Sequence, residues 1–250
     1  YSKSLKTKGE YVDLAQARAQ GIVVCNCQGY GTAAVAQHTL MLMLNLATSF
    51  LKYDRAVREG KWQQAQQFCL LDFPISELSG KTLGIVGFGE LGQAVAKLAE
   101  AFGMKILVAQ LPNRPSVQGR MTLDELLSQV DFLSLHCPLT DETRDLIAEA
   151  ELSKMKPSAF LINCARGGIV NEAALKASLI NKTIAGAATD VLSVEPPVAG
   201  NLLLDDDSIP NLIITPHSAW GSVDARQRIV TQMIENLLAF QQGQPIRQVN

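Results

Sequence analysis

The chain has 250 residues, of which 47% are hydrophobic and 18% are charged, and its formal net charge is −2. This apolar share can fill a sizeable core and excludes disordered and fibrous architectures, and the length fits one large domain or two modest ones. The small net charge, without a basic run, argues against nucleic acid or an anionic membrane surface as the main partner.

Short apolar runs alternate with helical stretches along the chain. Most of these runs lack an alternation of polar and apolar residues, which is typical of strands buried on both faces of a parallel sheet. We predict strands at residues 22–26, 82–86, 105–109, 131–136, 159–163, 184–189 and 212–215. Strands that alternate with helices predict an α/β fold with a doubly wound parallel sheet and right-handed crossovers.

Several of the predicted helices carry a start or stop signal. Thr122 and Glu125 form a capping box, and Gly103 and Gly243 follow helix ends. The predicted helices span residues 14–19, 32–59, 90–102, 122–129, 149–155, 171–180 and 222–242. The stretch 32–51 is apolar nearly all round, so we expect it to be buried on all sides or to face a partner.

Five cysteines, an odd number without a CxxC pair, do not form a disulfide framework. They are typical of a reducing compartment, so we expect a cytoplasmic protein. Cys25-Asn26-Cys27 resembles half of a metal site, but no second half follows; we interpret both thiols as buried at a strand end and predict no metal site. The longest apolar run, 39–51, is shorter than the ~20 residues that cross a bilayer.

The chain divides into three predicted parts. Residues 1–28 contain a polar lead, one helix and one strand, which is too little for a core of their own. We interpret them as the remnant of a second domain that is mostly absent from a chain beginning at Tyr1 rather than Met. Residues 29–221 form a dinucleotide-binding domain, and residues 222–250 form a helix and tail that return to the second domain.

The segment Gly87-Phe88-Gly89-Glu90-Leu91-Gly92 matches the GxGxxG pattern of dinucleotide-binding proteins. It follows a predicted strand and opens a predicted helix, the context in which the pattern is informative. Glycines permit a tight turn and let backbone N–H groups approach a pyrophosphate, and the helix N-terminus favours that anion. A glycine-rich turn without a ligand is the alternative interpretation.

The end of the next strand normally carries an acidic residue that binds the ribose hydroxyls of NAD. Gln110 stands at this point, and Arg114 follows within reach of a 2′-phosphate. The predicted cofactor is therefore NAD or NADP, with NADP favoured.

Polar side chains gather where predicted strands end, at His136-Cys137-Pro138, Cys164-Ala165-Arg166, Asp190 and His217. The carboxyl ends of parallel strands meet at one edge of a sheet, and ligands of open α/β sheets bind beyond that edge. These residues therefore mark one edge of the sheet as a site.

Three histidines are candidates for proton transfer, because imidazole titrates near neutral pH. His38 lies inside an apolar helix and is interpreted as structural, and His136 ends a strand without a nearby carboxylate. His217 is the best candidate, with Glu195 of the preceding loop as the carboxylate that orients it. A solvated loop charge is the alternative interpretation of Glu195. The planar guanidinium of Arg166 suits bidentate binding of a carboxylate.

Taken together, these residues resemble the D-isomer-specific 2-hydroxyacid dehydrogenase family, and within it the branch of glycerate dehydrogenase and hydroxypyruvate reductase. The resemblance runs from about Val12 to Asn250, and the branch rests mainly on GYGT, AQH and Trp220. The matching motifs are GYGT at 29–32, VAQH at 35–38, GFGELG at 87–92, HCPLTDETR at 136–144, NCARGGIVNEAAL at 163–175, AATDVLSVEPP at 187–197 and TPHSAWGSVDARQRIV at 215–230.

The resemblance implies a Rossmann-type coenzyme domain, part of a flavodoxin-like substrate domain, and hydride transfer between NAD(P)H and a short 2-oxoacid such as hydroxypyruvate or glyoxylate. Arg166 would bind the substrate carboxylate and polarise its carbonyl, and His217 would protonate the carbonyl oxygen. Glu195 would keep the imidazole charged. Asp190 would contact the nicotinamide carboxamide, and Trp220 would wall the substrate pocket or simply pack.

The resemblance also implies a set of contacts and an assembly. The residues expected to contact the substrate are Arg166, His217 and Trp220. A homodimer through the helix that begins at residue 32 is the natural expectation. The residues expected to contact the cofactor are Gly87, Gly89, Glu90, Leu91, Gly92, Gln110, Arg114, Cys137, Pro138, Thr143, Cys164, Ala165, Arg166, Asp190 and His217.

One loop departs from the family pattern. The carboxylate-binding loop T-G-x-x-N-V-D aligns with residues 7–13, where Lys8 replaces Gly and Tyr11 replaces Asn. The backbone amides that hold the substrate are therefore in question, so a chain that binds the cofactor with little turnover is one alternative. A nicotinamide-sensing regulator similar to the family's transcriptional co-repressors is another, although its expected polar tails are missing.

Overall fold

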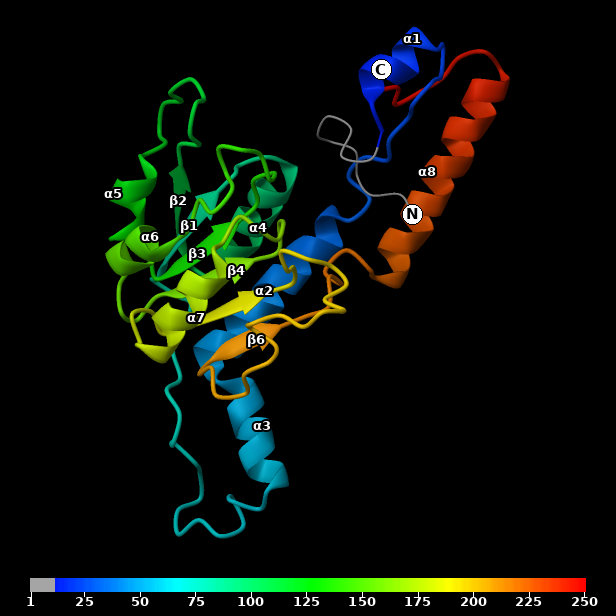
Figure 1. Cartoon of the computed structure of the whole chain (residues 1–250). Coiled ribbons are helices and arrows are strands. Elements are labelled where there is room, and N and C mark those ends of the chain that lie inside the picture. Colours follow the sequence, from blue (N-terminus) through cyan, green and yellow to red (C-terminus); the bar gives the residue numbers. More distant parts are fainter. Residues whose placement is uncertain (1–11) are drawn as a thin grey trace. The chain divides into compact units, whose positions relative to one another are not determined.

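Six parallel strands form one sheet in the computed structural model, which describes residues 12–250 (Figure 1). They are β1 Thr82–Val86, β2 Lys105–Ala109, β3 Phe132–Leu135, β4 Phe160–Asn163, β5 Gly186–Thr189 and β6 Leu212–Ile214. The order across the sheet is β2-β1-β3-β4-β5-β6, and every neighbouring pair is parallel. Met121 bridges to Ala109 of the edge strand β2, in the position of one further strand.

Helices cover both faces of this sheet, which confirms the predicted doubly wound fold. On one face, α5 (Leu123–Leu127), α6 (Glu149–Lys154) and α7 (Glu172–Ile180) pack their leucines against β3 and β4. On the other face, α2 (Thr32–Thr48) and α4 (Glu90–Ala101) pack against β1. Because the strands are buried on both faces, their sequences are apolar without alternation.

The contacts of the chain divide it into two units. The larger unit contains residues 35–219 and therefore the whole sheet. The smaller unit contains, of the described residues, 12–34 and 220–250, with α1 (Leu14–Ala19) and α8 (Val223–Gln241). Inside the smaller unit, Cys27 and Tyr30 pack with Ala225 and Ile229 of α8.

The strand predicted at residues 22–26 does not form. This segment pairs with the C-terminal tail through one antiparallel bridge, Cys25 with Gln248. Flanking hydrogen bonds run from Asn26 N to Arg247 O, 3.0 Å, and from Val249 N to Val24 O, 2.9 Å. One bridge is too short a ladder for a strand, and the prediction of two buried thiols holds for Cys27 but not for the half-buried Cys25.

The helix predicted at residues 32–59 is two helices. Ser49 has a φ of 52°, in the left-handed region, and ends α2; α3 (Phe50–Arg58) follows after a bend of 63°. The Ser49 hydroxyl donates to the carbonyl oxygen of Pro74, 2.8 Å away, so the bend is fixed by a contact distant in sequence. Local periodicity does not reveal such a contact.

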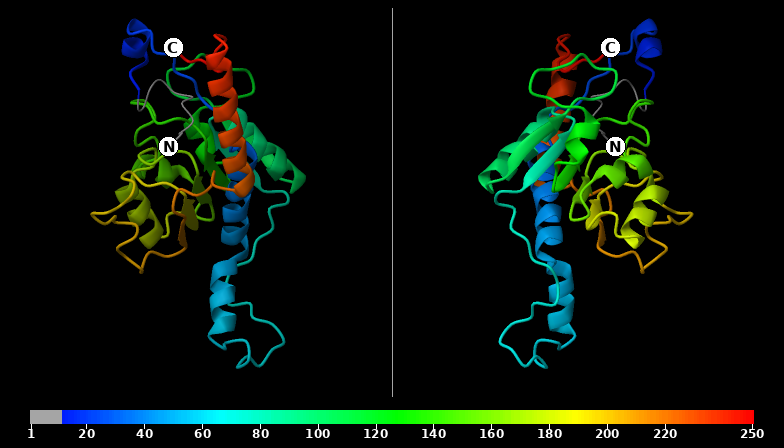
Figure 2. Two further views of the ribbon diagram at one scale, coloured as in Figure 1. Left: turned by 90° about the vertical axis from the view of Figure 1, so that its right-hand side faces the viewer. Right: turned by 90° about the vertical axis from the view of Figure 1, so that its left-hand side faces the viewer.

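The break separates a buried helix from an exposed one. Most of α2 is buried against the sheet, with Leu42 and Met43 fully covered. In contrast, α3 and the loop after it project away from the sheet (Figures 1 and 2). We call residues 50–75 the arm. No single helix in the described part of the chain is long and apolar enough to cross a membrane; α2 and α3 meet that criterion only as a bent pair.

The loop aligned with the family's carboxylate-binding loop, residues 7–13, lies outside the described residues except for Val12 and Asp13. The carboxylate of Asp13 caps α1 by accepting a hydrogen bond from Gln16 N, 2.9 Å. This gives Asp13 a local structural role.

We expect Met43→Ala to lower the free energy of unfolding by about 2–5 kcal/mol, because Met43 is fully buried between α2 and the sheet. Met41, on the same helix, is 37% exposed, so Met41→Ala is the matched control and is expected to cost well under half as much. Urea denaturation of both variants measures the difference. Equal losses would show that α2 is not part of the core.

Candidate active site

A tight turn joins β1 to α4 and contains the three glycines of the predicted dinucleotide motif. A Cβ on Gly87, where φ is +97°, would lie 2.5 Å from the backbone N of Cys137, and a Cβ on Gly92 would overlap the carbonyl oxygen of Gly87. The first and third glycines are therefore required by packing of the protein itself. This packing also places the turn beside the residues that follow β3.

The middle glycine has a different environment. Nothing lies within 4 Å of the position a Cβ on Gly89 would take, and Gly89 caps α4 without a side-chain hydrogen bond to its first N–H groups. An open surface in front of a helix N-terminus fits the approach of a pyrophosphate. Glu90 is exposed on the first turn of α4, and Leu91 is half-buried against the core.

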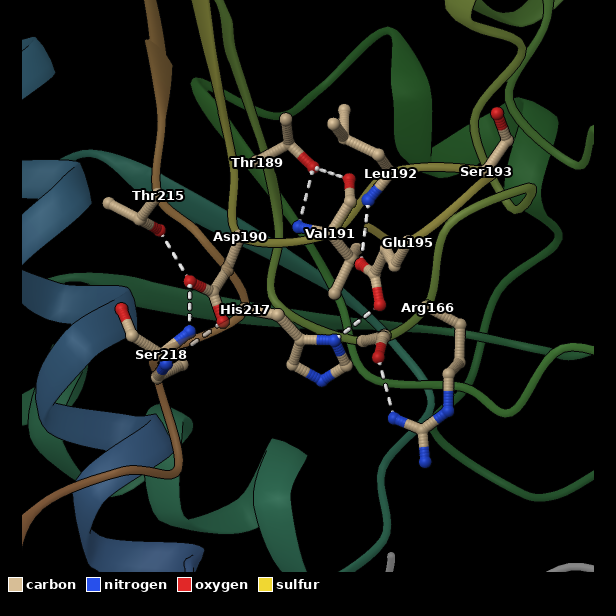
Figure 3. A network of polar contacts seen from close by, with 12 residues as sticks. Arg166, Thr189, Asp190, Val191, Leu192, Ser193, Glu195, Thr215, His217 and Ser218 are labelled. Atoms are coloured by element: carbon tan, nitrogen blue, oxygen red, sulfur yellow. Dashed lines mark hydrogen bonds and ion pairs between the residues drawn. The ribbon is translucent and has the colours of Figure 1, made fainter. Parts of the chain in front are cut away.

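The turn after β6 presents His217 at the carboxyl edge of the sheet (Figure 3). His217 has a φ of 52°, in the left-handed region that costs a non-glycine residue energy. Its backbone N–H is shared between the carbonyl oxygens of Asp190, 2.8 Å, and Thr215, 3.0 Å. The turn is therefore held by the neighbouring segment after β5.

The side chain of Asp190 completes this support. Its carboxylate accepts hydrogen bonds from the Thr215 hydroxyl, 2.5 Å, from Ser218 N, 3.0 Å, and from Ala219 N, 2.9 Å. Asp190 is only 1% exposed, and a buried carboxylate needs such donors to offset the loss of water. The contact with the nicotinamide carboxamide stays a prediction, but Asp190 has a structural task that the sequence did not reveal.

His217 and Glu195 form a direct pair (Figure 3). The imidazole Nδ1 lies 2.6 Å from Glu195 Oε2, and the two side chains are 28% and 27% exposed. Glu195 Oε1 also accepts from Leu192 N, 2.9 Å. The alternative that Glu195 is a solvated loop charge does not match this geometry.

Arg166 follows β4 in the adjacent loop, and its side chain is drawn beside His217 in Figure 3. It is half-buried, and its Nη1 donates to the carbonyl oxygen of Ala165, 2.7 Å. Asn163, at the end of β4, supports the same loop by donating to the Arg166 carbonyl oxygen, 3.0 Å, and by accepting from Ala165 N, 3.1 Å. Arg166, Glu195 and His217 thus come from three neighbouring strand ends.

The other two histidines lie in different settings. His136 Nε2 lies 2.9 Å from the Ser134 hydroxyl, and burial lowers the pKa of His136 to about 4, so its imidazole is neutral near pH 7. His38 Nε2 lies 3.0 Å from the Thr215 hydroxyl and 3.6 Å from Asp190 Oδ1. This geometry gives the predicted structural role of His38 a specific meaning. His38 contacts Thr215 and Asp190, and these two residues support the turn that carries His217.

Four further residues predicted to contact the cofactor, Cys137, Pro138, Thr143 and Cys164, follow the strands β3 and β4. Burial raises the pKa of the Cys137 thiol to about 11 and that of the Cys164 thiol to about 12, so both stay protonated. The Thr143 hydroxyl donates to the carbonyl oxygen of Pro138, 2.7 Å, and closes the turn after β3. Contacts of these residues with a cofactor stay predictions.

Gln110 organises the loop after β2. Its side-chain amide donates to the carbonyl oxygens of Arg114, 3.1 Å, and Pro115, 3.0 Å. Its oxygen accepts from Val117 N, 3.3 Å. Arg114 itself is exposed, so this loop presents a cation at the surface.

Trp220 belongs to the smaller unit, where its ring stands nearly perpendicular to that of Tyr30, with 6.3 Å between the ring centroids. Its predicted contact with the substrate stays a prediction. Among residues 12–250, no group of three or more His, Cys, Asp or Glu side chains is placed to hold a metal ion.

Sequence reasoning missed two supporting residues, Thr189 and Thr215. The Thr189 hydroxyl donates to Val191 O, 2.6 Å, and shapes the turn after β5, as Thr215 shapes the turn after β6. The sequence did contain a signal for both residues, because each is a threonine at the last position of a predicted strand.

Comparison with known proteins supplies an independent view of the chain. A family model described as "D-isomer specific 2-hydroxyacid dehydrogenase, NAD binding domain" matches residues 40–219. A glycerate dehydrogenase of Methylorubrum extorquens is 46% identical over 239 residues, covering 96% of this chain and 75% of its own.

Two solved structures are similar over nearly the whole chain. An NADPH-dependent glyoxylate/hydroxypyruvate reductase from Sinorhizobium meliloti has a TM-score of 0.82 and 34% identity, covering 98% of this chain and 76% of its own. A D-lactate dehydrogenase from Aquifex aeolicus, complexed with NAD and lactic acid, has a TM-score of 0.79 and 30% identity, covering 94% and 74%.

We expect Thr215→Val to lower the free energy of unfolding by about 1–3 kcal/mol, because it removes the hydroxyl between His38 and Asp190 and leaves a buried carboxylate with fewer donors. Thr215→Ser keeps the hydroxyl and is the control, expected close to the original protein. Chemical denaturation compares them. A Val variant as stable as the Ser variant would remove Thr215 from the support of this turn.

Proposed function

This chain belongs to the D-isomer-specific 2-hydroxyacid dehydrogenase family, in the branch of glycerate dehydrogenase and hydroxypyruvate reductase, and we propose that it reduces a short 2-oxoacid with a nicotinamide dinucleotide. The reverse reaction oxidises the matching D-2-hydroxyacid. Hydroxypyruvate and glyoxylate are the first substrates to test. The 2.6 Å contact between His217 and Glu195 carries the proposal.

The turn from Gly87 to Gly92 holds the dinucleotide in this proposal. The open position at Gly89 and the uncapped N-terminus of α4 fit its pyrophosphate, and the ends of β1 and β3 flank the point where the strand order reverses. When bound, the reduced nicotinamide supplies the hydride. The residues of the chain supply binding, orientation and the proton.

His217 donates the proton to the carbonyl oxygen of the substrate from Nε2, since Nδ1 faces Glu195. A carboxylate beside an imidazolium stabilises its charge, which keeps the acid form available. In the reverse direction the neutral imidazole accepts the hydroxyl proton. The left-handed turn, held by Asp190, aims the imidazole at the open edge of the sheet.

Arg166 binds the carboxylate of the substrate and polarises its carbonyl. A guanidinium presents parallel N–H donors that match a carboxylate, and the loop after β4 holds it beside His217 (Figure 3). A 2-oxoacid bound in this way has its carbonyl oxygen between the cation and the acid. The negative charge that develops on that oxygen is stabilised from both sides.

NADP is the cofactor that we favour. Gln110 offers no carboxylate for ribose hydroxyls and instead holds the loop that exposes Arg114.

A location in the cytoplasm is part of the same proposal, since all five cysteines are free thiols. The named relatives are enzymes, so the alternative of a nicotinamide-sensing regulator gains no support. The other alternative is a chain that binds the cofactor but turns over little substrate. The steady-state assay described below distinguishes it from an active enzyme.

A homodimer is also proposed, through the arm rather than through α2. Seven large apolar side chains of the arm are exposed, and apolar patches of this kind mark protein interfaces. They are Phe50, Leu51, Val57, Trp62, Phe68, Leu71 and Ile75, with exposures between 41% and 91%. Most of α2 is buried, so we place the proposed contact with the second copy on the arm instead of on α2.

We expect His217→Gln to lower kcat for hydroxypyruvate or glyoxylate reduction by ~10²–10⁴, the scale of a general acid. Steady-state assays with NADPH and NADH measured separately check this, and a higher kcat/KM with NADPH is expected. The control is His136→Gln, whose imidazole is neutral and buried. A His217→Gln enzyme with near-normal kcat would exclude His217 as the acid, and a chain that binds NADPH without turnover would contradict the proposed activity.

We expect the double variant Phe68→Ser/Leu71→Ser to raise the dimer dissociation constant about tenfold or more, since interface side chains often contribute over 1 kcal/mol each. Phe102→Ser, an exposed aromatic residue outside the arm, is the control. Light scattering over a concentration series gives the masses. A monomer in the unmodified chain at micromolar concentration would refute the dimer.

A further inference from the structure

Glu172, the first residue of α7, receives three hydrogen bonds from the loop that contains Glu195. Its Oε1 accepts from Ser193 N, 2.7 Å, and its Oε2 accepts from the Ser193 hydroxyl, 2.9 Å, and from the Asn201 amide, 2.9 Å. One carboxylate therefore fastens the loop on both sides of Glu195. Three converging donors match a carboxylate, because an amide would turn its own N–H groups toward some of them.

The same loop packs tightly on the segment that carries Arg166. A Cβ on Gly167 would overlap the carbonyl oxygen of Leu192, so the two backbones are in direct contact. Leu192 N in turn donates to Glu195 Oε1, 2.9 Å, which leaves Oε2 for His217. The contacts run without a gap from Glu172 through Ser193 and Leu192 to Glu195.

The pair of Glu195 and His217, to which these contacts lead, depends on an ordered loop. Glu195 and His217 are each more than a quarter exposed, and an exposed ion pair pays conformational entropy to hold both side chains in one geometry. A loop that is already fixed reduces that cost. We propose that Glu172 is a positioning residue, which holds the loop so that the Glu195 carboxylate reaches His217 Nδ1. The inference rests on the proposed function, in which His217 is the acid.

The other attachment of α7 allows this role to be separated from general support. Lys176, one turn further along, pairs with Asp206 at 2.8 Å and so ties α7 to a later part of the connection between β5 and β6, beyond Asn201. At His217, Glu195 pairs with the imidazole and Asp190 supports the turn that carries it. Replacing Glu172 keeps Glu195 and Asp190 in the chain and releases the loop donors of Ser193 and Asn201.

The test compares Glu172→Gln with the matched control Lys176→Met. The chain has three histidines, so NMR can follow each imidazole through a pH titration without any nucleotide, and His217→Gln assigns the signal. When Glu195 is displaced the imidazolium loses its partner, so the titration midpoint of His217 is expected to fall. We also expect kcat for reduction to fall roughly 10- to 100-fold, with the Kd for NADPH unchanged. Lys176→Met should change none of these.

A double variant tests whether Glu172 acts through Glu195. If it does, Glu172→Gln adds no further loss of kcat and no further shift of the midpoint in a Glu195→Gln background. Additive effects would overturn the inference, as would an unchanged His217 midpoint in Glu172→Gln beside a clear shift in Glu195→Gln. Should Glu172→Gln not fold, Ser193→Ala removes one donor and should shift the midpoint less in the same direction; no shift would count against the inference.

The two proposals fail in distinguishable ways. If His217→Gln keeps its activity, the proposed function is wrong, yet the titration of the nucleotide-free chain still decides whether Glu172 places Glu195. If His217→Gln loses activity and Glu172→Gln alters neither kcat nor the midpoint, the proposed function stands and only the role of Glu172 is wrong.

Discussion

The buried carboxylate of Asp190 is the constraint on which the candidate site depends. A charge that is 1% exposed is tolerated only when donors replace water, and here the donors are the Thr215 hydroxyl and the backbone of residues 218 and 219. Satisfying the charge therefore folds the segment after β6 into a tight turn. The turn places His217 in a left-handed conformation that would otherwise be unfavourable.

The parallel sheet makes this constraint effective at several positions at once. The ends of β4, β5 and β6 lie side by side, so Arg166, Glu195 and His217 reach one edge although about 50 residues separate the first from the last. Direct packing of Gly167 on Leu192, and the bonds from the Glu172 carboxylate, join the loops after β4 and β5. In the reaction that we propose, three groups held in this way stabilise the developing charge without first having to rearrange.

In the arm, apolar side chains are exposed to solvent instead of being buried in the core. Periodicity predicts one long helix over residues 32–59, but the Ser49 hydroxyl bonds to Pro74 and the chain bends there. The first half fills the core under the sheet, and the second half exposes aromatic and aliphatic side chains. The stretch predicted as one helix therefore divides into a part inside the fold and an exposed part, where we propose that a second copy binds.

The sequence by itself determined the doubly wound sheet and the glycine turn, and it pointed to the three residues that we propose for the acid site, because strand type, turn chemistry and strand-end position are local patterns. All five strands predicted between residues 82 and 189 coincide with strands of the sheet. Tertiary structure alone decided the loss of the strand at 22–26, the break at Ser49, and the hydrogen-bond partners of Asp190, Thr215 and Glu172. Each depends on a hydrogen bond to a residue at least 20 positions away, and such bonds leave no periodic trace in the sequence.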